Sequence, residues 1–211
     1  MIDRKGRVEL ALFAKAPVPG KVKTRLTTVF SAEQACAIHC QLIELMCDNL
    51  AQCVDLDWRL WVSEHHTYFN DLAALHSVSI EQQRGGGLGE RLQDAANRSL
   101  SRADQCILIG SDCPDLTAAY VHEAMNILAQ PDCDIVIGPA TDGGYVLLGL
   151  KQRRAELFTD IDWGSNQVFA QTQKKIRESG LGLRLLPKLS DIDHPDDVRQ
   201  CVALHSSLPH F

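Results

Sequence analysis

The sequence predicts an α/β sandwich with a mostly parallel sheet. Short apolar runs alternate with longer stretches of helical periodicity, a pattern typical of strands joined by helices. With 211 residues, the chain has the length of about one domain. Its composition, 45% apolar and 23% charged residues, is that of a globular protein rather than a disordered or fibrous one. We therefore expect one domain that spans residues 1–211.

Each expected element rests on its own periodicity and end signals. Ser31 and Gln34 form a capping-box pattern at the start of one helix, and Thr117 can cap another. Pro195 stands at the first turn of the last helix, which is a common helix start. The apolar runs predict strands at Val8–Ala14, Leu56–Val62, Val78–Gln83, Cys106–Ile109, Asp134–Gly138, Tyr145–Leu150 and Leu183–Leu186. The helical patterns cover Ala32–Ala51, Leu88–Arg102, 118–130, Asn166–Ser179 and Pro195–Leu204.

Charge and hydropathy exclude several classes of partner. Lys and Arg number 21 against 27 Asp and Glu, which gives a net charge of −6, and no Lys/Arg run exceeds two residues. Such a chain is a poor candidate for binding duplex DNA or a membrane surface. No stretch approaches the ~20 apolar residues of a membrane span. The first apolar run is too short for a signal peptide, so we expect a cytoplasmic protein without nucleic-acid or membrane partners.

The eight cysteines are predicted to be reduced packing residues. No Cys-x-x-Cys pair exists, so the spacing of a zinc ribbon is absent. Cys36, Cys40 and Cys47 recur at helical spacing, which indicates core thiols on one face of a helix. Cys113 has acidic neighbours that disfavour its thiolate, and we expect it to pack rather than react.

The first loop that follows a strand concentrates positive charge. In parallel sheets ligands bind outside the carboxyl ends of the strands, so these loops are where a site is expected. Residues 15–25 hold four cations on an otherwise acidic chain, which suits a polyphosphate, although a solvated basic turn is the alternative. Proline stiffens the loop and glycine allows close approach to a ligand. The cations are Lys15, Lys21, Lys23 and Arg25. The residues that we assign to nucleotide binding here are Ala14, Lys15, Pro19, Gly20 and Lys23.

A second loop is rich in glycine. Four glycines within residues 85–89 lead into a predicted helix. Backbone N–H groups at a helix N-terminus can bind an anion or a base edge, and a flexible connector is the alternative. We assign Gly86, Gly87, Leu88 and Gly89 to nucleotide binding.

Three further segments carry carboxylates. Asp112 follows a buried strand, where a carboxylate can hold a divalent cation that bridges phosphates, unless it serves only the turn. Asp191 and Asp193 point to one side if the chain is extended there, and they could complete that metal site. Alternatively, Asp193 caps the last helix. The residues that form a tight hairpin-like turn and that we assign to substrate binding are Asp142, Gly143, Gly144 and Tyr145.

Four motifs carry a resemblance over residues 8–205. They are Ala14-Lys15-Ala16-Pro17 through Thr24-Arg25-Leu26, Gly110-Ser111-Asp112-Cys113-Pro114, Asp142-Gly143-Gly144-Tyr145 and Asp191-Ile192-Asp193. Together they resemble a bacterial glycosyltransferase-like family of unknown function, labelled radical-SAM/selenodomain-associated transferase 1. The resemblance implies the nucleotide-diphospho-sugar transferase (GT-A) fold, a three-layer sandwich. It also implies kinship with 2-phospholactate guanylyltransferase and the molybdenum-cofactor nucleotidyltransferases. In those relatives the first loop cradles the nucleotide phosphates, and the positions matched by Asp112 and Asp193 hold magnesium.

These residues predict a nucleotidyltransferase that uses Mg²⁺ or Mn²⁺. It would join an NTP to a small-molecule acceptor and release pyrophosphate, since four cations favour a triphosphate over the diphosphate of a nucleotide sugar. Charge neutralisation by Lys15, Lys21 and Arg25 and a metal ion on Asp112, Asp193 and Asp191 would supply the catalysis. If Asp112 and Asp193 share one cation, they lie much closer together than ~10 Å.

Two other functions stay open. A glycosyltransferase would use a nucleotide sugar at the same loops, and it would need a base for the acceptor hydroxyl, for which Asp142 is the candidate. A non-catalytic nucleotide-binding domain is the third possibility. The presence of both Asp112 and Asp193 argues against it.

Overall fold

Seven strands form one sheet in the computed structural model, which describes residues 6–204. The strands are β1 (Val8–Ala14), β2 (Asp57–Val62), β3 (Ser79–Gln82), β4 (Gln105–Gly110), β5 (Ile135–Pro139), β6 (Tyr145–Leu150) and β7 (Leu183–Leu185). Their order is β3-β2-β1-β4-β6-β5-β7. All seven predicted strands are present, with ends that differ from the prediction by no more than one or two residues.

The sheet is parallel except at β6, which runs antiparallel to both β4 and β5. A parallel connection needs a long crossover, whereas only a short turn joins β5 to β6. In that turn the Ala140 N–H donates to the Gly144 carbonyl oxygen at 3.0 Å. The hairpin-like turn predicted from Asp142 and Gly143 is therefore confirmed, and it joins the one reversed strand to β5.

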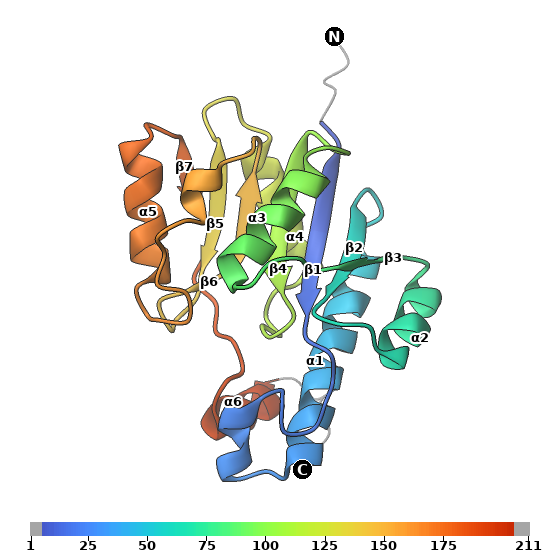
Figure 1. The fold of residues 1–211 in the computed structure, drawn as a ribbon. Coiled ribbons are helices and arrows are strands. Elements are labelled where there is room, and N and C mark those ends of the chain that lie inside the picture. The colour runs from blue at the N-terminus through green and yellow to red at the C-terminus, as the bar shows by residue number, and fades with distance from the viewer. Residues whose placement is uncertain (1–5, 205–211) are drawn as a thin grey trace.

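Helices cover both faces of this sheet (Figure 1). They are α1 (Ala32–Ala51), α2 (Thr67–His76), α3 (Leu88–Ser99), α4 (Ala118–Leu128), α5 (Val168–Glu178) and α6 (Pro195–Leu204), with 3-10 turns η1 (Thr24–Thr28) and η2 (Ala155–Leu157). The side chains of β1 alternate between two cores, with Leu10 and Leu12 facing α1, α2 and α4, and Ala11 facing α3 and α5. The three-layer α/β fold is thus confirmed.

The predicted caps of the helices are present. The Ser31 hydroxyl accepts from the Gln34 N–H, and the Gln34 side chain accepts from the Ser31 N–H, which completes the capping box of α1. Thr117 caps α4 through the Tyr120 N–H. One helix was not expected: the N-cap of α2 is His66, whose ring rather than a Ser, Thr, Asp or Asn side chain accepts the Tyr68 N–H.

A third, smaller core lies below the sheet, where η1, the first half of α1 and α6 pack together (Figure 1). Leu26 from η1, Leu42 from α1 and Val198 from α6 are buried in it. This lobe joins the first loop of the chain to its last helix. Among the helices in residues 6–204, none has the length and hydropathy of a membrane span.

All eight cysteines are free thiols. Seven of them are buried and Cys40 is half-buried, as predicted for packing residues. Burial raises the pKa of Cys47 to about 12, so this thiol stays protonated and apolar in character.

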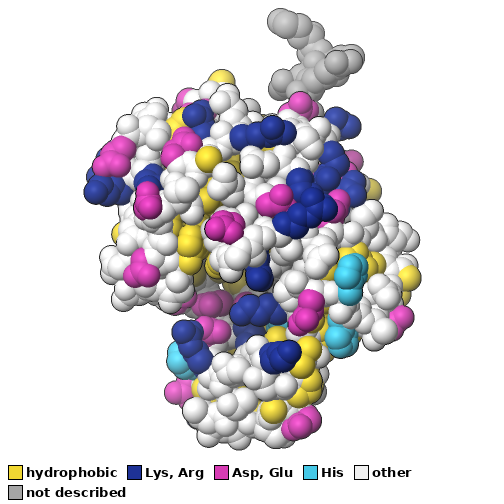
Figure 2. All heavy atoms as spheres, in the orientation of Figure 1, with side chains coloured by type: hydrophobic (Ala, Val, Ile, Leu, Met, Phe, Trp, Pro, Cys, Tyr) yellow, Lys and Arg dark blue, Asp and Glu magenta, His cyan; other side chains and the backbone are white. Residues whose placement is uncertain are grey.

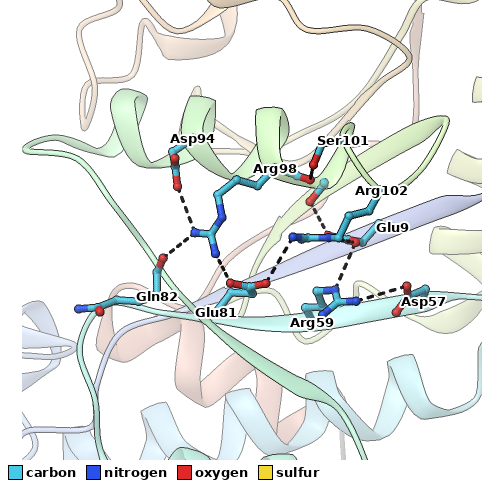
Figure 3. A network of polar contacts seen from close by, with 10 residues as sticks. Glu9, Asp57, Arg59, Glu81, Gln82, Asp94, Arg98, Ser101 and Arg102 are labelled. Carbon is cyan, nitrogen blue, oxygen red and sulfur yellow. Dashed lines mark hydrogen bonds and ion pairs between the residues drawn. The ribbon is translucent and has the colours of Figure 1, made fainter.

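At the end of the sheet where β1 begins, a charged network fastens α3 to the strands (Figure 3). Glu9 is fully buried and accepts hydrogen bonds from Arg102 (2.7 Å to Oε2), from the Ser99 hydroxyl (2.7 Å) and from Arg59 (3.2 Å). The Arg98 guanidinium pairs with Glu81 and stacks 4.4 Å from the Trp61 ring. Burial alone would raise the pKa of Glu9, but the hydrogen bonds from Arg102 and Ser99 outweigh it, so this pKa lies below its usual value.

We predict that Glu9→Gln lowers the free energy of unfolding by about 2–3 kcal/mol at pH 7, because charge-assisted bonds from two arginines are lost. A folded-state pKa below the unfolded value adds stability that is present above the unfolded pKa and is lost as the pH falls through the folded one. The wild type should therefore lose more stability than the variant on acidification below about pH 4.5. Urea unfolding at several pH values measures both effects. Glu123→Gln removes the same charge from an exposed position on α4, so it should change neither the free energy of unfolding at pH 7 nor its loss on acidification. A loss of stability as large as that of Glu9→Gln would contradict the prediction.

Candidate functional site

Two adjoining cavities open at the carboxyl ends of β1 and β4. These parallel neighbours end side by side, so the loops that follow them, residues 15–23 and 111–117, meet at one edge of the sheet. Figure 2 shows the molecule hollowed between the sheet and the smaller lobe, with Lys, Arg, Asp and Glu side chains gathered there. One cavity has a volume of about 480 Å³ and the other about 320 Å³, and Arg25, Leu88, Asp112 and Asp193 line both.

The larger cavity carries the positive charge. Its wall includes Lys15, Lys21, Lys23 and Arg25 together with Ala14. Pro19 and Gly20, which were also assigned to nucleotide binding, lie outside this wall and shape the turn instead. Gly20 has a φ of +78°, a left-handed conformation that glycine adopts without strain.

Two contacts hold the first loop in place. The Ala16 N–H donates to the Ser63 hydroxyl at 3.0 Å, just beyond β2. On the other side, His39 of α1 contacts the Lys15 carbonyl oxygen through Nε2 at 2.9 Å. The four cations are therefore carried on a fastened backbone rather than on a free turn.

Lys23 lies between Asp112 and Asp193. Its side chain is only 4% exposed, and its Nζ is 2.8 Å from Asp112 Oδ1 and 3.8 Å from Asp193 Oδ1. The ammonium also donates to the Ile192 carbonyl oxygen at 2.6 Å. Arg25 pairs with the second oxygen of Asp193. Both carboxylates thus contact one cation, and they lie well within the ~10 Å limit set for a shared ion.

Backbone hydrogen bonds bring the end of the chain to this point. The Ile192 N–H donates to the Asp112 carbonyl oxygen at 2.9 Å, and the Leu189 N–H donates to Pro139 at 3.0 Å. The side chain of Asp197 accepts from the Asp193 and His194 N–H groups at the start of α6. Asp197, the third residue of α6, thus holds the turn before the helix, while the Asp193 carboxylate contacts Lys23 and Arg25.

Burial and these contacts shift the pKa values of three side chains at the site. Burial would raise the pKa of Asp112, but the Lys23 ammonium outweighs it and holds this pKa below its usual value. Burial lowers the pKa of His39 more than the Lys15 carbonyl and Asp112 raise it, so the ring is neutral near pH 7. Burial and the nearby Asp142 raise the pKa of Asp191 to about 6.

The smaller cavity is acidic and aromatic. Phe13, Tyr145 and Trp163 line it, and the rings of Tyr145 and Trp163 meet edge to face with centroids 6.2 Å apart. Asp142 and Asp191 add two carboxylates. Asp191 therefore belongs to this cavity and has no direct contact with Lys23 among the ion pairs of residues 6–204, unlike the other two carboxylates assigned to a metal ion.

In the turn that we assigned to substrate binding, packing and hydrogen bonding account for most of the residues. The Asp142 side chain accepts the Gly144 N–H at 2.8 Å. A Cβ on Gly143 would lie 2.1 Å from the Asn166 carbonyl oxygen, and its φ is +94°, so only glycine fits there. Of the four residues, Asp142, Gly144 and Tyr145 line the cavity.

The glycine-rich loop reaches the cavities at one residue, Leu88, whose side chain is 48% exposed. The Gly86 N–H already donates to the Glu90 carboxylate at 2.7 Å. Gly89 faces the other way, because a Cβ there would lie 2.3 Å from the Trp163 ring nitrogen. Gly86, Gly87 and Gly89 are absent from both cavity walls, so this part of the loop fixes the start of α3 rather than lining the cavities.

Sequence reasoning assigned no role to several residues that line the cavities, among them His39, Gln83 and Trp163. His39 lies within α1, Gln83 directly follows β3, and Trp163 follows η2. A polar His on the buried face of an otherwise apolar helix was the available signal for His39. Nothing local distinguishes Gln83 or Trp163, since each reaches the site only through the packing of the sheet.

The chemical types of the donor atoms suit a divalent cation, but the distances between them do not. Carboxylate oxygens are the ligands that Mg²⁺ and Mn²⁺ prefer, and Asp112 and Asp193 converge on one positive charge. Within residues 6–204, however, no three His, Cys, Asp or Glu side chains stand close enough to hold a metal ion. The Lys23 ammonium lies between the two carboxylates.

Comparison with known proteins agrees with the fold. A model of the family described as "Uncharacterized protein conserved in bacteria (DUF2064)" matches residues 46–165. No curated protein matches the sequence.

Solved structures match along nearly the whole chain. A protein from Desulfovibrio desulfuricans G20, provisionally named a nucleotide-diphospho-sugar transferase, is 28% identical with a TM-score of 0.82, and the match covers 93% of this chain and 96% of that one. CMP:2-keto-3-deoxy-manno-octonic acid synthetase, solved with CTP, is 11% identical with a TM-score of 0.60 and coverages of 94% and 98%. Glucosyl-3-phosphoglycerate synthase from Mycobacterium tuberculosis, solved with Mn²⁺, UDP and glucosyl-3-phosphoglycerate, is 14% identical with a TM-score of 0.57 and coverages of 94% and 76%. The nucleotide-diphospho-sugar transferase fold is thereby established.

We predict that Cys113→Ala leaves magnesium-nucleotide binding unchanged. Cys113 is 2% exposed, and burial raises the pKa of its thiol to about 12, so it contributes packing rather than a thiolate. Calorimetric titration of both proteins with a nucleotide and Mg²⁺ checks this. A loss of binding in a variant that still unfolds cooperatively would contradict it.

Proposed function

The chain belongs to the bacterial family DUF2064, and from that premise we propose that it is a metal-dependent nucleotidyltransferase. It joins an NTP to a small acceptor and releases pyrophosphate. Its fold is shared with enzymes solved with CTP and with UDP, which supports a nucleotide as one substrate. The kinship with 2-phospholactate guanylyltransferase and the use of Mg²⁺ are parts of the same proposal.

The observation that carries the proposal is the charge of the larger cavity. Four cations line it against the two carboxylates of Asp112 and Asp193, which leaves a surplus of positive charge. His39 is neutral and does not change this balance. A triphosphate carries more negative charge than the diphosphate of a nucleotide sugar, so the surplus favours an NTP.

Each of these residues has a role in transfer of the nucleotidyl group. Lys15 and Lys21 are exposed side chains on the fastened first loop, free to approach phosphate oxygens. Arg25 can grip two oxygens at once, whereas a lysine acts as a point charge. A divalent cation held by Asp112 and Asp193 would neutralise charge on the phosphates. Positioning and charge neutralisation lower the barrier of such in-line reactions, so no protein nucleophile is required.

The smaller cavity suits the acceptor. At about 320 Å³ it has room for a small molecule, and Tyr145 and Trp163 offer apolar surface. The two cavities share Arg25, Asp112 and Asp193 at their junction. An acceptor in the smaller cavity would therefore meet the phosphates at the residues that neutralise them. Leu88, which also lines both, would lie beneath the base or ribose.

One observation favours glycosyl transfer as the second candidate. Asp191 lies in the smaller cavity with a pKa of about 6, so it is a better base for an acceptor hydroxyl than Asp142, whose side chain is engaged in its own turn. A glycosyltransferase needs such a base. The larger cavity would then bind the diphosphate of a nucleotide sugar.

We predict that Arg25→Ala weakens NTP binding about ten- to hundredfold and weakens NDP binding much less. The reason is the loss of a charge-assisted hydrogen bond of about 1.5–3 kcal/mol to the third phosphate. Calorimetric titration with NTP, NDP and a nucleotide sugar, each with Mg²⁺, measures the difference.

The matched control is Arg199→Ala. Arg199 is an exposed arginine on α6 that pairs with Asp196 and lines neither cavity, so its loss lowers the net charge equally. Equal weakening of NTP and nucleotide-sugar binding by Arg25→Ala would favour glycosyl transfer. Unchanged NTP affinity would remove the case for a triphosphate.

A further inference from the structure

A buried histidine faces the paired carboxylates with an unused nitrogen. The side chain of His39 is 4% exposed, and its Nε2 lies 2.9 Å from the Lys15 carbonyl oxygen. A carbonyl oxygen only accepts, so Nε2 carries the proton and Nδ1 carries a lone pair. Nδ1 has no hydrogen-bond partner and lies 3.9 Å from Asp112 Oδ1. Buried polar atoms are almost always paired, so an orphan nitrogen beside a carboxylate calls for an explanation.

The environment of His39 is that of a metal ligand. Histidines that bind metal ions usually donate their other N–H to a backbone carbonyl or a carboxylate, which fixes the tautomer and the ring. Nitrogen and oxygen ligands lie about 2.0–2.2 Å from a transition-metal ion, so two donors on one ion are at most about 4.3 Å apart. The distance of 3.9 Å between Nδ1 and Asp112 Oδ1 is within that limit. Two neutral or anionic acceptors at this distance gain nothing from each other without a cation between them.

When no metal ion is bound, the Lys23 ammonium supplies the positive charge that the two carboxylates need. This ammonium contacts Asp112 and Asp193, but it comes from the first loop, whose exposed Lys15 and Lys21 also line the larger cavity. An ammonium and a divalent ion cannot occupy the same space between two carboxylates. One of them must leave when the other binds.

We propose that Lys23 is an exchangeable counter-cation, which a divalent metal ion replaces, and that His39 Nδ1 joins Asp112 and Asp193 as a ligand of that ion. Arrival of the ion releases the Lys23 ammonium into the larger cavity, where it meets the phosphates. The exchange rests on the proposed function, because it gives Lys23 a phosphate partner only if a nucleotide binds there. It requires Asp193 to turn toward the ion by a change of side-chain rotamer. A nitrogen ligand also makes the site favour Mn²⁺ over Mg²⁺.

The test measures Mn²⁺ binding to the full chain without nucleotide. The paramagnetic resonance signal of free Mn²⁺ gives the affinity, and pulsed spin-echo spectra detect a directly bound ¹⁴N nucleus. We expect ¹⁴N modulation in the wild type at saturating Mn²⁺, and none in His39→Gln. His122→Gln, on exposed α4, is the matched control and should retain the signal.

A second variant tests the exchange. Lys23→Met removes the competing charge, so Mn²⁺ should bind at least about tenfold more tightly than to the wild type. Lys23→Gln repeats the measurement if the Met variant does not fold, and thermal unfolding reports which variants are folded. Absence of ¹⁴N modulation in wild type, or an affinity unchanged by both Lys23 substitutions, overturns the proposal. NTP titration in Mg²⁺ separates the two claims, because a chain that binds Mn²⁺ through His39 but no nucleotide would contradict the proposed function alone.

Discussion

The site depends on the ion pair between Lys23 and Asp112. This contact, with the Ile192 hydrogen bonds to both residues, joins the loop after β1, the loop after β4 and the segment before α6. A buried charge is tolerated only when it is paired, so each of the three segments fixes the others. Asp112 and Asp193, which the contact brings to one ammonium, line both cavities.

The two cavities differ in the charge of the residues that line only one of them. The larger one gathers cations from a single stretch of eleven residues, and the smaller one gathers Asp142 and Asp191 from segments nearly fifty residues apart. In the function that we propose, a polyphosphate would occupy the basic surroundings and an acceptor that loses a proton the acidic ones. The single antiparallel strand contributes to this division, because the short turn before β6 carries Asp142 to the same edge of the sheet as Asp112.

Several motif residues have structural contacts of their own. Gly89 and Gly143 are glycine because Trp163 and Asn166 pack against their Cα atoms, and Gly86 is held by Glu90. The sequence assigns Gly86 and Gly89 to nucleotide binding and Gly143 to substrate binding, since a glycine that packs and a glycine that contacts a ligand look the same in sequence. For His39 the sequence pattern misleads in the opposite direction: its position on the buried face of α1 suggests a core residue, but its side chain lines the larger cavity.

The sequence by itself determined the alternation of strands and helices, the caps of α1 and α4, and the cation-rich first loop. These are local features, set by periodicities of two and 3.6 residues and by side chains a few positions apart. It also indicated that Asp112 and Asp193 belong together. Only the tertiary structure decided that Lys23 lies between them, that Asp197 accepts the N–H groups before α6, and that Asp191 turns to the other cavity. Such choices depend on which charges are buried together, and burial is set by the packing of segments that are distant in the chain.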